Sequence, residues 1–99
     1  MRVLLAMTLL ILGASQALAA SDADFRAAYA AAEAAEKEAG TLRNRWLTTE
    51  TTLKAASEAA KGGNFDAATA RAREAEALAK ASIFQATSEK ERWKEMEIH

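Results

Sequence analysis

The chain has 99 residues, with no cysteine, no proline, 13 basic and 14 acidic side chains, and a formal net charge of -1 at pH 7. Without cysteine, disulfide bridges, thiolate metal sites and haem attachment through a Cys-x-x-Cys-His motif are excluded. Basic and acidic residues alternate along the chain. It therefore lacks the concentrated positive surface that nucleic-acid-binding proteins and basic membrane-surface helices need.

Residues 1–19 have the pattern of a secretory signal peptide. Arg2 gives a positive start, residues 3–12 form an apolar core, and the segment Ala17-Leu18-Ala19 supplies the small residues of a cleavage site. An uncleaved anchor is the alternative, but a membrane-spanning helix needs about 20 predominantly apolar residues, and polar residues dilute the end of this stretch. We expect cleavage after Ala19 and a periplasmic mature chain, residues 20–99, with no membrane span and a net charge of -2 once Arg2 is removed.

The mature segment predicts an all-α fold, a long antiparallel two-helix hairpin with coiled-coil-like packing. The first helix is expected over residues 22–61, with Ser21 as N-cap and Asp24 completing a capping box. Gly40 beside Thr41 could instead end a helix and give three helices. We expect one continuous helix, because an uncharged stripe at steps of three and four keeps its phase across this point. The stripe consists of Phe25, Ala28, Ala32, Ala35, Ala39, Leu42, Trp46, Thr49, Leu53, Ala56 and Ala60.

The hairpin turn is expected at Gly62, Gly63, Asn64 and Phe65. Glycine adopts the left-handed conformation that ends a helix, and Asn64 can cap the next helix, which is expected over residues 65–96. Its stripe is Phe65, Ala68, Ala72, Ala75, Ala79, Ser82, Ala86, Glu89, Trp93 and Met96. Folding at the turn opposes residues whose numbers sum to about 126, since both helices share one rise per residue. Trp46 then faces Ala79 and Ser82, Leu53 faces Ala72 and Ala75, Trp93 faces Ala32 and Ala35, and Tyr29 faces Met96.

No residue cluster suits catalysis or metal binding. His99 is the single histidine, so no second one can join it in nucleophilic or acid–base chemistry. The carboxylates have basic partners four residues further on, as in Glu33–Lys37, Glu50–Lys54 and Glu76–Lys80, which is typical of solvated helix faces. We expect a protein that is not an enzyme and has no cofactor.

The hairpin has few large apolar side chains to bury, and small chains without disulfides or metals usually need an associate. Trp46, Leu47, Ile83 and Phe84 are expected at one level, halfway along the hairpin. This cluster is either a wide core or a docking patch for a partner protein. We take it as the candidate partner-binding site.

Over residues 36–85 the chain resembles the SoxXA-binding proteins, small periplasmic helical proteins of bacterial thiosulfate oxidation. The resemblance rests on Trp46 with Thr49, on Leu53 with Ala56 and Ala60, on the turn Gly63-Asn64-Phe65, and on Ala68, Ala72 and Ala75. Asn64 stands where the family usually has aspartate. The resemblance implies an accessory subunit, without haem or catalytic residues of its own, that binds the c-type cytochrome SoxXA.

Two other interpretations remain. The turn also resembles that of tetratricopeptide arrays, but those repeat every 34 residues and this hairpin is longer and has no second copy. The stronger alternative is a periplasmic structural hairpin that forms a homo-oligomer or binds another envelope protein.

Overall fold

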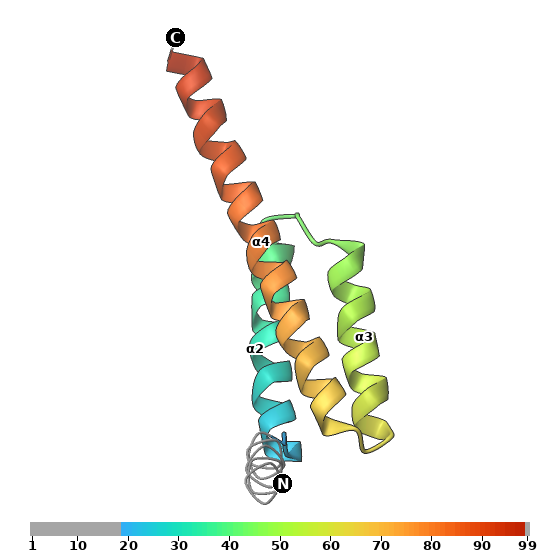
Figure 1. Cartoon of the computed structure of the whole chain (residues 1–99). Helices are drawn as coiled ribbons and strands as arrows, with labels where there is room; N and C mark the ends of the chain where they lie inside the picture. Colours follow the sequence, from blue (N-terminus) through green and yellow to red (C-terminus); the bar gives the residue numbers. More distant parts are fainter. Residues whose placement is uncertain (1–18, 99) are drawn as a thin grey trace, which may run out of the picture.

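The structure is a computed structural model that describes residues 19–98. These residues form three α-helices and no strand: α2 (Asp22–Thr41), α3 (Leu47–Lys61) and α4 (Phe65–Ile98). In Figure 1, α2 and α4 run in the same direction, and α3 runs in the opposite direction. The expected all-α class is confirmed. The expected signal peptide lies outside the described residues, apart from Ala19.

The expectation of one continuous helix over residues 22–61 is wrong, because the chain leaves the helix after Thr41. The end of α2 is a Schellman motif. The N–H of Asn44 donates to the carbonyl of Ala39 at 2.9 Å, and the N–H of Arg43 donates to the carbonyl of Gly40 at 3.0 Å. Arg43 adopts the left-handed conformation, with φ of 56°. Glycine is the residue that usually adopts this conformation. Because Arg43 stands here instead, the sequence does not indicate the end of the helix.

The end of α3 repeats the same motif 20 residues further along the chain. The N–H of Asn64 donates to the carbonyl of Ala59 at 3.0 Å, and that of Gly63 donates to the carbonyl of Ala60 at 3.0 Å. Here a glycine does hold the left-handed position, with φ of 81° for Gly63. Asn64 also caps α4, because its Oδ1 accepts the N–H of Ala67 at 3.2 Å. The second reversal therefore lies where the sequence predicts a turn.

Hydrogen bonds attach the remaining chain segments to α4. The side-chain amide of Asn44 donates to the carbonyl of Ser82 at 2.7 Å and to Oε1 of Gln85 at 3.3 Å, which places the loop of residues 42–46 beside the middle of α4. At the opposite end, the N–H of Ala20 donates to Oδ1 of Asp66 at 2.6 Å. The start of α2 carries the expected capping box between Ser21 and Asp24, with hydrogen bonds of 2.9 and 3.1 Å.

Small side chains fill the core. Apart from Leu53, the buried apolar residues of the described chain are all alanine, and they belong to the two helical stripes of the sequence: Ala32, Ala35, Ala39, Ala56, Ala68, Ala72, Ala75 and Ala79. The stripes therefore mark the interior correctly, although the chain folds once more than expected. α2 and α3 each turn their half of the first stripe toward α4.

The extra reversal changes which residues meet. Ala32, Leu53 and Ala75 form one buried cluster, against which Tyr29 packs. The meeting of Leu53 and Ala75 agrees with the expected register of α3 against α4.

The expected pairing of Trp93 with Ala32 and Ala35, and of Tyr29 with Met96, is wrong. Because α2 runs parallel to α4, it lies along the first half of α4 and leaves the last turns uncovered. We call residues 87–98 of α4 the overhang; Figure 1 shows it extending past the ends of α2 and α3.

Candidate functional site

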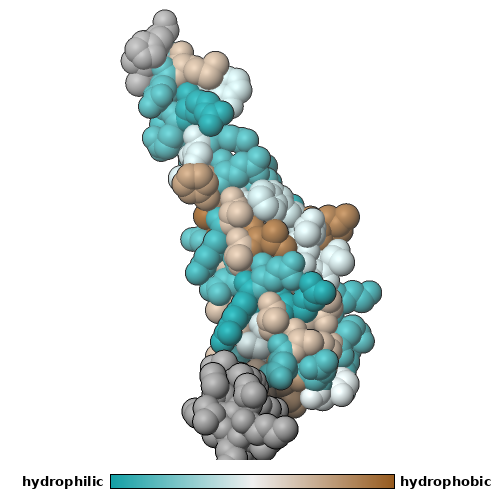
Figure 2. All heavy atoms as spheres, viewed as in Figure 1, coloured by the Kyte–Doolittle hydropathy of each residue, from teal (hydrophilic) through white to brown (hydrophobic). Residues whose placement is uncertain are grey.

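The large apolar side chains that stay exposed in residues 19–98 all lie at one end of the bundle. They are Leu42, Leu47, Phe84, Trp93 and Met96, with exposed fractions from 39% to 81%. This loop end consists of residues 42–47 and of α4 from Ser82 outward. In Figure 2, most strongly hydrophobic spheres on the visible face gather at the level of the upper end of α3. Such a concentration is typical of a surface that binds another protein.

The four predicted partner-binding residues all belong to the loop end, but they differ in exposure. Leu47 is 81% exposed and Phe84 is 74% exposed, whereas Trp46 and Ile83 are half-buried. Phe84 follows the buried Ser82 by two positions, so its side chain leaves α4 about 200° away from that of Ser82. Leu47 and Phe84 are therefore available to a partner, and Trp46 and Ile83 belong partly to the core.

Sequence reasoning missed Trp93 and Met96 as surface residues, because it assigned them partners in the first helix. They are 65% and 63% exposed. Trp93 borders an open depression of about 460 Å³ between the overhang and the loop, together with Leu42, Asn44, Ala86, Glu89 and Lys90. The sequence feature that could have predicted this site is the stripe of the second helix, because Trp93 and Met96 continue it past the point where the bundle ends.

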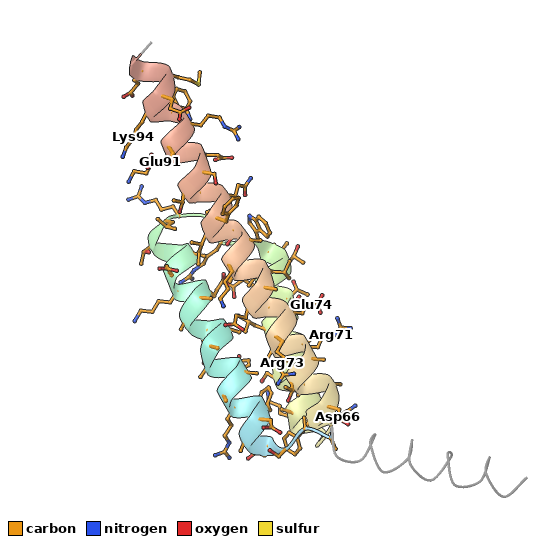
Figure 3. The ribbon with its side chains drawn as sticks, turned by 60° about the vertical axis from the view of Figure 1, so that its left-hand side comes forward. Asp66, Arg71, Arg73, Glu74, Glu91 and Lys94 are labelled. Atoms are coloured by element: carbon orange, nitrogen blue, oxygen red, sulfur yellow. The ribbon has the colours of Figure 1, made fainter. Side chains whose placement is uncertain are left out.

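Charged side chains on α4 point outward and pair with near neighbours along the same helix (Figure 3). Arg71 and Glu74 are 2.9 Å apart, and Glu91 and Lys94 are 3.6 Å apart. The expected pair of Glu76 with Lys80 is present at 3.1 Å. These pairs are solvent-exposed or partly so, as is typical of solvated helix faces.

A second cluster lies between α2 and α3 and was not expected from the sequence. Glu36 is only 5% exposed, and neither of its carboxylate oxygens has a hydrogen-bond partner. It borders a pocket of about 200 Å³ with Arg45 and Glu50. Burial is the main cause that raises the pKa of Glu36, the neighbouring carboxyl group of Glu50 raises it too, and Arg45 lowers it; together they bring this pKa to about 7. The sequence predicted that Glu50 pairs with Lys54 and did not predict that it lies near Glu36.

The part of the chain that the structure describes contains no group of three or more histidine, cysteine, aspartate or glutamate residues placed to hold a metal ion. Among the helices of residues 19–98, none is long and apolar enough to cross a membrane. Comparison of the chain with family models, curated proteins and solved structures found no match.

Proposed function

We propose that the protein is a non-catalytic periplasmic accessory protein that binds a partner protein through its loop end, and that the partner is the cytochrome SoxXA. The observation that carries the docking proposal is the gathering of Leu47, Phe84, Trp93 and Met96 at this end. The opposite end, at the turn before α4, exposes no large apolar side chain in the described residues. The choice of SoxXA rests on the resemblance in residues 36–85.

Export is the second part of the proposal. The signal-peptide pattern of residues 1–19 supports cleavage after Ala19, which would make Ala20 the first residue of the mature chain. The backbone nitrogen of Ala20 already lies 2.6 Å from a carboxylate oxygen of Asp66. Cleavage would turn this nitrogen into an ammonium group with an acidic partner in place.

Capture of SoxXA by the immobilised protein tests the docking proposal, with haem absorbance as the readout. We expect Phe84→Ala to weaken the complex at least tenfold, because truncation of an aromatic residue at an interface centre commonly costs more than about 2 kcal/mol. The helix should persist, since alanine is the best helix former. Arg73→Ala is the matched control, an exposed truncation on α4 nearer the opposite end.

Capture that is lost in the control, or unchanged in Phe84→Ala with intact circular dichroism, would place the interface elsewhere. No capture by the wild-type protein would end the SoxXA assignment. The second candidate function, a structural protein that self-associates, is favoured by the overhang, whose stripe has no partner within the described chain. Sedimentation of the isolated protein separates the two, because a self-associating overhang gives a mass that rises with concentration.

A further inference from the structure

The pocket between α2 and α3 holds a carboxyl group in an unusual setting. Glu36 is almost fully buried, yet both of its oxygens lack a hydrogen-bond partner. A buried carboxylate without partners carries a desolvation cost that proteins avoid by pairing or by protonation. Glu50 borders the same pocket from α3. Two carboxylates cannot donate to one another, but a protonated Glu36 can donate to Glu50.

The other charged groups around the pocket come from α2 and from the loop. Glu33 and Lys37 border it from α2 and are exposed, and Arg45 borders it from the loop. Tyr29 on α2 is affected by the same charges. Burial is the main cause that raises its pKa above the ordinary value, and Glu33 and Glu50 raise it further, so the phenol is neutral around pH 7. Within residues 19–98, α4 contributes no side chain to the pocket lining.

We propose that Glu36 and Glu50 form a pH-sensitive contact between α2 and α3. With one proton on the pair the two helices stay together, and loss of that proton loosens α3 and moves the loop of residues 42–46. Ionisation of Glu36 puts a buried negative charge on α2 beside the exposed carboxylate of Glu50 on α3. A metal ion is the less suitable occupant, because the positive charge of Arg45 is already at the pocket.

Arg45 links the pocket to the loop end. Its guanidinium lies over Gly40 so closely that a Cβ built on this glycine would be 2.5 Å from Nε of Arg45. Arg45 directly precedes Trp46, which is the N-cap residue of α3. A second negative charge in the pocket changes the electrostatic pull on Arg45, and we expect the surroundings of the neighbouring Trp46 to change with it. The indole of Trp46 therefore reports on the protonation state.

The direct test on the wild-type protein is a titration of glutamate carboxyl carbons by NMR. We expect the Glu36 signal to titrate near pH 7. A midpoint close to 4.5, the ordinary pKa of the group, would overturn the proposal. Because this measurement needs no substitution, it remains decisive even where a variant fails to fold.

A second test follows Trp46 fluorescence from pH 5 to pH 9 in a Trp93→Phe background, where Trp46 is the remaining one of the chain's two tryptophans. We expect an emission change with a midpoint near pH 7 that disappears in Glu36→Gln. The control Glu33→Gln removes an exposed carboxyl from the same pocket and should leave the change intact. A change that persists in Glu36→Gln would contradict the proposal. Reversal of the high-pH state by added magnesium would assign the pocket to a cation instead.

The urea midpoint supplies the thermodynamic sign. Between pH 4.5, the ordinary pKa of the group, and about 7, its pKa in the folded protein, the folded state holds a proton that the unfolded state has lost. The stability of the wild type therefore falls as pH rises through this range. Glu36→Gln should show no such fall, and an equal fall in both proteins would assign it to other groups.

Discussion

Two threonines on α3 differ in whether their buried hydroxyls are satisfied. Thr49 is fully buried and its Oγ1 has no hydrogen-bond partner. Thr52 is 8% exposed, and its hydroxyl donates to the carbonyl of Thr48 at 2.7 Å. A buried hydroxyl without a partner costs free energy, whereas one bonded within its own helix is close to neutral.

We therefore predict that Thr49→Val raises the free energy of unfolding by about 1 kcal/mol. Valine keeps the shape of threonine and has a similar helix propensity, so the change isolates the hydroxyl. Urea unfolding followed by circular dichroism measures it. Thr52→Val is the matched control and should bring no gain. An equal gain in both variants would mean that the added methyl group, and not the removed hydroxyl, stabilises the fold.

At the level of the elements, the molecule reverses direction twice with one motif. Each helix end has the same pair of backbone hydrogen bonds and an asparagine after the left-handed residue. The left-handed residue itself is Arg43 in the first motif and Gly63 in the second. A residue with a Cβ costs roughly 1–2 kcal/mol in this conformation, and glycine does not.

This difference predicts opposite effects at equivalent positions. Arg43→Gly should stabilise the protein by about 1 kcal/mol, and Gly63→Ala should destabilise it by a similar amount. Gly62→Ala is the control: its φ is -81° and an added Cβ would be 3.6 Å from the nearest atom. It should stay within about 0.5 kcal/mol of wild type. Thermal unfolding ranks the three, and a loss of stability in Arg43→Gly would mean that the arginine side chain outweighs backbone strain.

The two reversals also show how far the sequence predicted the elements. The turn after α3 was predictable, because Gly62 and Gly63 form a glycine pair that is typical of a helix end. The turn after α2 was not, because Arg43 has no preference for the left-handed conformation and the apolar stripe continues through Leu42 and Trp46. The periodic pattern identifies the buried face of a helix. It does not reveal a helix end when the apolar spacing continues unchanged across it.

The candidate site was predictable only in part for the same reason. The sequence left open whether the cluster with Leu47 and Phe84 is a wide core or a docking patch, and in the structure both of these residues are exposed. The surroundings of Trp93 were predicted wrongly and those of Glu36 were not predicted, because both depend on the direction of α2. Running α2 parallel to α4 removes the expected partner of Trp93 and brings Glu50 back toward Glu36.

For the whole molecule, the overhang is the segment of α4 that extends past the ends of α2 and α3. A helix of about a dozen residues is marginal in water by itself, and this one has no other helix beside it (Figure 1). We predict fast amide hydrogen exchange for residues 88–98 in the isolated protein and slow exchange for residues 68–82 of the same helix, which carry the buried alanines.

Addition of the partner should then protect residues 88–98. Mass spectrometry of exchanged peptides measures both states, and the core segment of α4 serves as the internal control. Full protection of the overhang in the dilute, monomeric protein would contradict the prediction, because it would mean that this segment is stable without any partner.

The alanine core has a thermodynamic consequence for the entire chain. Unfolding raises the heat capacity by an amount that grows with the apolar area newly exposed to water. An alanine side chain exposes little apolar area. Because Leu53 is the one large residue among the buried apolar side chains of the described chain, we expect a heat-capacity change per residue at the low end of the range for globular proteins. A small heat-capacity change flattens the dependence of stability on temperature. We therefore expect the stability of this fold to change little between cold and warm conditions.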